Sequence, residues 1–91
     1  MHTLSAKLTF YIPECTSLKE KRQVRRSIID KACKKFNASI AEVGTQDIHQ
    51  TLTIGIAVVS GEFAHGQKCL DEIVRFMEVN TEAELVNEEF L

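Results

Sequence analysis

Basic side chains gather in one stretch of the chain, SLKEKRQVRRSIIDKACKK, which runs from Ser17 to Lys35. This stretch holds eight of the 11 Lys and Arg residues and only two acids, although the formal net charge of the whole chain is −2. Clustered Lys and Arg side chains bind phosphate and carboxylate groups through charge-assisted hydrogen bonds. A helix that begins here would add free backbone amides and a partial positive charge. The stretch is therefore a candidate anion site.

The candidate site is centred on the first turns of a predicted helix. On a helical wheel, Lys19, Arg22 and Arg26 share one flank of the apolar stripe. Lys21 and Arg25 fall within the apolar sector, so we expect either that the first two turns overhang the sheet or that the aliphatic stems cover the core edge while the charges point outward. These bases would contact phosphates, and the Ser17 hydroxyl with the nearby amides would order the helix end. The candidate residues are Ser17, Lys19, Lys21, Arg22, Arg25 and Arg26.

The same cluster of charges is also compatible with three alternatives to a phosphate site. Lys and Arg are good helix formers, so the stretch can be a solvated helix face without a ligand. It can also bind an acidic protein partner. The third alternative is a contact with a second copy of the chain. Residues 71–91 carry seven acids and one base, which would allow a head-to-tail contact between basic and acidic surfaces.

No combination of residues in the chain predicts catalysis, a metal or a cofactor. His65 and Cys69 have the i, i+4 spacing of two metal ligands on a helix, but no second pair accompanies them. Glu42, Asp47 and His49 are groups that can exchange protons, yet a turn at Asp47 and a bulge at Glu42 account for them more simply. The chain also lacks a glycine-rich phosphate loop and a nucleophile motif. We therefore expect a binding protein, not an enzyme.

Length and composition are those of one globular domain spanning residues 1–91. The longest apolar-rich stretch, residues 52–59, is too short to cross a bilayer, and the N-terminus lacks the basic and apolar blocks of a secretory signal. Three cysteines at irregular spacings favour reduced thiols, and we expect Cys33 to be a small core residue. These features predict a cytoplasmic protein with no membrane contact.

Hydrophobic periodicity predicts four strands and two helices. Apolar residues alternate in the strands and recur at i, i+3, i+4 and i+7 in the helices. A capping box at Ser17 and Glu20 begins the first helix, and a bulge near Ala41 and Glu42 is needed to keep the Glu42 carboxylate out of the core. The predicted elements are strand 2–12, helix 17–36, strand 38–43, strand 50–60, helix 64–80 and strand 83–91.

This order of elements predicts an α+β fold of the ferredoxin-like type. Two strand–helix–strand units whose strands have one apolar face place both helices on the same face of the sheet. Right-handed crossovers then give a βαββαβ sandwich with a four-stranded antiparallel sheet of order 4-1-3-2. The open face of this sheet would carry mostly small and polar side chains, with Tyr11 as its aromatic residue. Such a face suits a sheet-to-sheet homodimer better than the stacking of RNA bases.

Three segments, SLKEKR, FNASIAEVGTQD and TLTIGIAVVS, resemble the YlxP-like family of small bacterial proteins, a domain family of unknown function. The resemblance covers nearly the whole chain and implies a ferredoxin-like fold with no established activity. Genes of this family often lie among those for transcription elongation factor NusA, initiation factor two and ribosome-binding factor A, which implies work with RNA or the ribosome. The chain departs from the family pattern at Ile48 and His49, where an aromatic residue is common.

Two hypotheses of function follow from these observations. The first is a cytoplasmic binding module that contacts RNA or a ribosomal particle through the basic start of the first helix. The second is a protein-interaction or homo-oligomerisation module that uses the open sheet face and has no nucleic-acid role.

Overall fold

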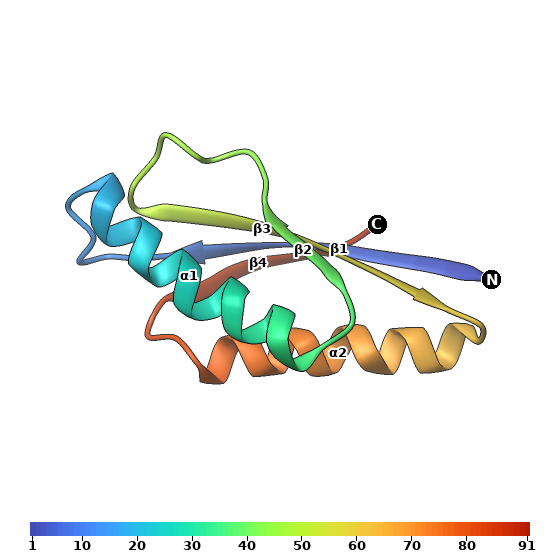
Figure 1. Cartoon of the computed structure of the whole chain (residues 1–91). Coiled ribbons are helices and arrows are strands. Elements are labelled where there is room, and N and C mark those ends of the chain that lie inside the picture. Colours follow the sequence, from blue (N-terminus) through green and yellow to red (C-terminus); the bar gives the residue numbers. More distant parts are fainter.

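A computed structural model describes all 91 residues of the chain. Its elements follow the predicted order of strand, helix, strand, strand, helix and strand (Figure 1). The elements are β1 (His2–Tyr11), α1 (Leu18–Lys35), β2 (Ser39–Glu42), β3 (Thr51–Ser60), α2 (Phe63–Val79) and β4 (Glu84–Phe90).

The four strands form one antiparallel sheet of order β2-β3-β1-β4, which is the predicted order read from the other edge. β1 lies at the centre and pairs with β3 along its whole length, from His2 opposite Ser60 to Tyr11 opposite Thr51. Both helices cover the same face of the sheet (Figure 1). The α+β, ferredoxin-like prediction is therefore confirmed.

The core lies between the sheet and the two helices. Alternate residues of β1, among them Leu8 and Phe10, are buried on the helix side, as the period of two predicts. Ile28 of α1 and Ile73 of α2 pack into the same cluster of 16 buried apolar residues. α2 packs tightly on β1 at Gly66, where a Cβ atom would lie 2.6 Å from a methyl carbon of Leu4. The burial of apolar side chains thus positions both helices on the sheet. At Gly66, the absence of a side chain also allows α2 to pack close to β1.

The start of α1 is capped in a slightly different way from the prediction. The Ser17 hydroxyl accepts a hydrogen bond from the Glu20 amide at 3.2 Å, as expected of the N-cap residue. The Glu20 carboxylate, however, accepts hydrogen bonds from the amide and hydroxyl of Thr16, at 2.9 and 3.1 Å, and not from the Ser17 amide. The backbone hydrogen bond from Thr16, and then that from its hydroxyl, lower the pKa of Glu20.

Two local predictions are wrong. β2 pairs with β3 in unbroken register from Ser39 to Glu42, so no bulge turns Glu42 away, and its carboxylate projects toward α1. The irregularity of the sheet lies in β4 instead, where the register with β1 shifts between Thr9 and Phe10. Cys33 is exposed on α1 and is not a core residue. Although Cys33 lies near the apolar stripe on the helical wheel, its side chain faces solvent and not the sheet.

Candidate functional site: the basic start of helix α1

Lys21, in the first turns of α1, is buried with its charge directed inward. Its side chain is 3% exposed and reaches the loop that joins β2 to β3. The ammonium donates to the backbone carbonyls of Thr45 and, at 2.7 Å, Ile48, and its Nζ lies 2.8 Å from Oε2 of Glu42. The last contact is an ion pair whose angle falls outside hydrogen-bond geometry, so Oε2 has no hydrogen-bond donor. An ammonium has three donors, and all of Lys21's polar contacts are therefore made inside the protein.

The prediction that the charge of Lys21 points outward is thus wrong. A buried ammonium is costly unless an opposite charge and hydrogen-bond acceptors surround it. The inward-facing Glu42 carboxylate and two loop carbonyls meet this need. The same requirement explains why β2 has no bulge at Glu42: the strand keeps its register because the carboxylate has a partner on α1.

Arg25 lies one turn further along α1 and shares the same carboxylate. Its Nη1 lies 3.4 Å from Oε1 of Glu42, and its side chain is 36% exposed, whereas that of Glu42 is 9% exposed. One carboxylate therefore faces two cations, so the cluster of Lys21, Arg25 and Glu42 keeps a formal charge of about +1 at neutral pH. Arg25 is partly engaged, and neither it nor Lys21 is a vacant phosphate contact.

The other three bases of the candidate site are free. Lys19, Arg22 and Arg26 are exposed and form no ion pair with any carboxylate of the chain. Their spacing of three and four residues places them along one stripe on the surface of α1. From Lys19 to Arg26 this stripe is about 10 Å long, at a rise of about 1.5 Å per residue. We call these three residues the free basic stripe. Ser17 completes the site as the N-cap of α1.

A hollow of about 230 Å³ separates the first turns of α1 from the loop after β2. Arg22 and Arg25 line it from the helix, and Gln46 and Asp47 line it from the loop. The sequence did not single out Gln46 or connect Asp47 with the basic helix. One signal was present: Lys21 and Glu42, of opposite charge, both occupy positions that the periodicity assigns to the core. Two such residues on neighbouring elements indicate a buried ion pair.

The remaining chemically active residues do not assemble into a second site. His65 Nε2 and Cys69 Sγ lie 3.7 Å apart on α2, and no group of three or more potential metal ligands is present. Glu42 is held by Lys21 and Arg25 and lines the same hollow as Asp47. Neither helix has the length and apolarity that crossing a bilayer requires.

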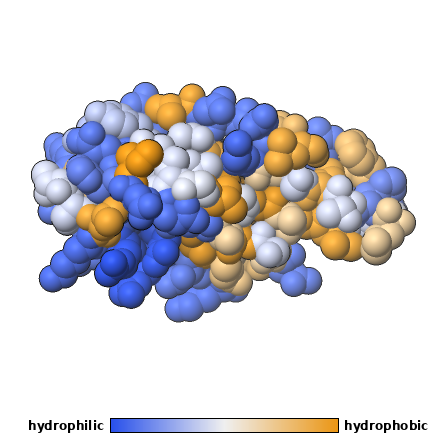
Figure 2. Space-filling view, turned by 90° about the horizontal axis from the view of Figure 1, so that it is seen from above, coloured by the Kyte–Doolittle hydropathy of each residue, from blue (hydrophilic) through white to orange (hydrophobic).

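The open face of the sheet differs in character from the basic start of α1. Figure 2 views the molecule from the side opposite α2, and hydrophobic surface dominates on the right of the view, where Figure 1 places the N-terminus. Hydrophilic surface dominates on the left, where α1 begins. Small side chains such as Ala41 and Ala57 line a shallow hollow of about 320 Å³ on this face, with Val43 and Leu91 beside them. Tyr11, the aromatic residue of the face, is 39% exposed.

Comparison with known proteins places the chain in a family. Residues 3–90 match the family model described as "Protein of unknown function (DUF503)". The chain is also 40% identical over 73 residues to "Uncharacterized protein YlxP" of Bacillus subtilis (strain 168), an alignment that covers 80% of this chain and 79% of the relative. The segments SLKEKR and AEVGTQD, which carry the resemblance to the YlxP-like family, contain Lys21 and Glu42 and meet at the buried ion pair. The chain therefore belongs to the DUF503 family, and YlxP of Bacillus subtilis is similar to it.

Proposed function

We propose that this protein is a cytoplasmic binding module, not an enzyme, and that it holds single-stranded RNA, free or in a ribosomal particle, through the free basic stripe. The observation that carries the proposal is that Lys19, Arg22 and Arg26 are exposed along one stripe of α1 with no carboxylate partner. The cytoplasmic part of the proposal is supported by three free cysteines.

The chemistry of the stripe fits phosphate oxygens. Arg presents a planar fork of donors that matches a phosphate, and Lys adds a mobile point charge. A base in the first turn of a helix opposes the helix dipole at a cost of about 0.3–1 kcal/mol; Lys19 lies in the first turn of α1, and a ligand explains its placement better than helix stability does. The buried Lys21–Glu42 pair supports the stripe by joining α1 to β2 and the following loop.

Phosphate contacts position a nucleic acid without reading its sequence. RNA-binding domains of this architecture gain sequence preference by stacking bases on aromatic residues of the open sheet face. Tyr11 is the aromatic residue that this face offers, and its neighbours across the strands, Thr51 and Glu84, are not aromatic. We therefore propose binding with weak sequence preference.

The test compares two double variants that lose the same charge. Arg22→Gln/Arg26→Gln removes two bases of the stripe, and Lys68→Gln/Arg75→Gln removes two exposed bases of α2. Fluorescence anisotropy with a labelled single-stranded oligoribonucleotide at low salt should show affinity reduced more than about tenfold for the first variant, because binding with fewer phosphate contacts releases fewer counterions. The α2 variant should bind within about twofold of wild type. Equal loss in both variants, or no binding by wild type, would overturn the proposal.

A second candidate function, homodimerisation through the open sheet face, is favoured by the shape and polarity of that face. The molecule is a slab with extents of 42 × 22 × 16 Å, so its broad face is comparable with the area of about 800 Å² per partner that a stable interface needs. Small side chains such as Ala41 and Ala57 let two sheets approach. Analytical ultracentrifugation should show a dimer that Ala57→Glu converts to a monomer, while Ala64→Glu on α2 leaves it intact. A wild-type monomer at millimolar concentration would rule this interface out.

A further inference from the structure

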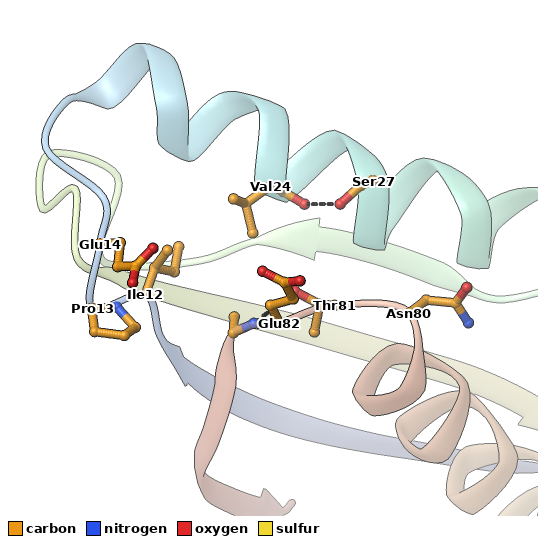
Figure 3. Close-up of a pocket in the computed structure, with 9 residues that line it drawn as sticks. Ile12, Pro13, Glu14, Val24, Ser27, Asn80, Thr81 and Glu82 are labelled. Atoms are coloured by element: carbon orange, nitrogen blue, oxygen red, sulfur yellow. Dashed lines mark hydrogen bonds between the residues drawn. The ribbon is translucent and has the colours of Figure 1, made fainter.

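A cleft of about 390 Å³ opens beneath the first half of α1, beyond the end of α2. Three segments form its walls, and Figure 3 shows their side chains. Val24 and Ser27 come from α1, residues 12–14 follow β1, and residues 80–83 join α2 to β4. Val24 and Ser27 lie on a different flank of α1 from the free basic stripe, as the helical repeat requires. The cleft is therefore separate from the proposed RNA site.

The floor of the cleft is apolar. Ile12 is buried in the core cluster, and Val24 and Ala83 are half-buried and pack against that cluster. An aliphatic chain laid on these three residues would remove apolar surface from water, at a gain of roughly 25 cal/mol per Å² of area. The floor thus suits a hydrocarbon segment.

The polar groups around this floor are almost all hydrogen-bond acceptors. Ser27 uses its hydroxyl to donate to the carbonyl of Val24, and Asn80 uses its side-chain amide to donate to the carbonyl of Phe76. The carboxylates of Glu14 and Glu82 take part in no hydrogen bond or ion pair. In Figure 3 the Glu82 side chain extends from its turn toward α1, into the space between the walls. The Thr81 hydroxyl accepts from the Ala83 amide and keeps its own donor, but a ligand that pairs with the two carboxylates must bring donors.

The end of α2 adds negative potential at the same place. The C-terminus of a helix carries a partial negative charge that a basic residue in the last turn normally offsets. The last turn of α2 contains no basic residue and does contain Glu78. Asn80, which lines the cleft, is the C-cap of this helix. The cleft therefore favours a cation by both its side chains and its helix end.

We propose that this cleft binds an ammonium or guanidinium group carried on an aliphatic chain. The chain would lie on Ile12, Val24 and Ala83, and the cationic head would donate to the Glu82 carboxylate, which extends into the cleft (Figure 3), with Glu14 on the wall adding negative charge. Two sources share this chemistry: a free aliphatic polyamine, and the Lys or Arg side chain of a peptide.

The test is a nuclear magnetic resonance titration of the ¹⁵N-labelled chain with agmatine, spermidine and a blocked Gly-Arg-Gly peptide, with 1-butanol as an uncharged probe. The amides of residues 12–14 and 80–83 should shift and saturate with at least one cation and should not respond to 1-butanol. Tighter binding of the free amines assigns a small-molecule ligand, and tighter binding of the blocked peptide assigns a protein side chain. No saturable shift with any cation at about 10 mM, a concentration well above the millimolar affinities of weak ligands, would overturn the proposal.

Paired variants then separate the cleft from charge in general. Glu14→Gln/Glu82→Gln should weaken binding at least tenfold, whereas Glu72→Gln/Glu88→Gln, which removes two exposed carboxylates elsewhere, should leave it within twofold. Equal affinities for both Gln variants would overturn the proposal. RNA binding plays no part in these outcomes, so the result is independent of the proposed function.

Discussion

At the scale of single residues, the most informative feature is the burial of a charge that the helical wheel alone would place wrongly. Lys21 is accommodated because Glu42 and the carbonyls of Thr45 and Ile48 surround its ammonium. Such a pair adds little net stability when it is intact, but it becomes costly when one partner is removed. The pair therefore fixes the position of the loop after β2 relative to α1 more than it strengthens the fold.

Lys21→Met should lower the free energy of unfolding by about 3–5 kcal/mol, because the change leaves the buried Glu42 carboxylate with Arg25 alone and strips two carbonyls of their donor. Urea denaturation measures the difference. Lys19→Met is the matched control and should change stability by less than about 0.5 kcal/mol, since that side chain is exposed. Equal, small effects of the two substitutions would show that the Lys21 contacts do not form in solution.

Glu20 gives the cap of α1 a pH dependence. Hydrogen bonds from the backbone and then the hydroxyl of Thr16 lower its pKa from the usual 4.5. A carboxylate with a lowered pKa in the folded state stabilises the protein above its usual pKa, and this contribution is lost as the pH falls through the lowered value. Glu20→Gln should therefore be less stable than wild type at pH 6, and the difference in melting temperature should shrink as the pH is lowered below 4.5. A difference that is constant with pH would contradict this assignment.

At the scale of elements, the packing of α2 on β1 depends on Gly66. A Cβ atom at this position would lie 2.6 Å from Leu4 Cδ1 and 3.0 Å from Ser60 Cβ. Gly66→Ala should therefore destabilise the protein by up to about 2 kcal/mol, because an overpacking cost of about 1–3 kcal/mol is offset by a gain in helix propensity of about 1 kcal/mol. Gln67→Ala, at the exposed neighbouring position, is the control for thermal unfolding. A more stable Gly66→Ala variant would show that α2 can move away from the sheet without loss.

The elements themselves could be predicted from the sequence because their apolar residues follow simple periods. β1 alternates without exception from Leu4 to Phe10, and the core positions of α2, such as Leu70 and Ile73, keep the helical period. A bulge in β2 was predicted wrongly because hydrophobic periodicity assumes that every charged side chain faces solvent. The assumption holds for isolated elements and fails where Glu42 finds a partner on another element, a contact that no local period contains.

At the scale of the whole molecule, charge and hydrophobicity are separated across the fold. The basic helix α1 contacts the edge strand β2, and the acidic strand β4 forms the opposite edge of the sheet. The distribution of charges along the sequence predicted the asymmetry, but it could not decide which bases are free. Only the pairing of Lys21 and Arg25 with Glu42 reduces five candidate bases to the three of the free basic stripe.

The two modes of self-association that the sequence left open respond differently to salt. A dimer formed through the open sheet face buries mainly small, uncharged side chains, with Lys7 and Glu89 already paired with each other, so its sedimentation should change little between about 0.05 and 0.5 M salt. A head-to-tail contact between α1 and β4 depends on exposed charges and should dissociate over this range. We expect the first behaviour, and dissociation at high salt would favour the contact between the charged surfaces.

The salt dependence of RNA affinity tests the central claim most directly. Three phosphate contacts from Lys19, Arg22 and Arg26 predict a slope of about −2 for the logarithm of the association constant against the logarithm of salt concentration, at about −0.7 per contact for a single strand. Arg22→Gln/Arg26→Gln should reduce the slope to about −0.7, and Lys68→Gln/Arg75→Gln should leave it unchanged. A slope near zero for wild type, or the same slope in all three proteins, would contradict the assignment of the free basic stripe as a phosphate site.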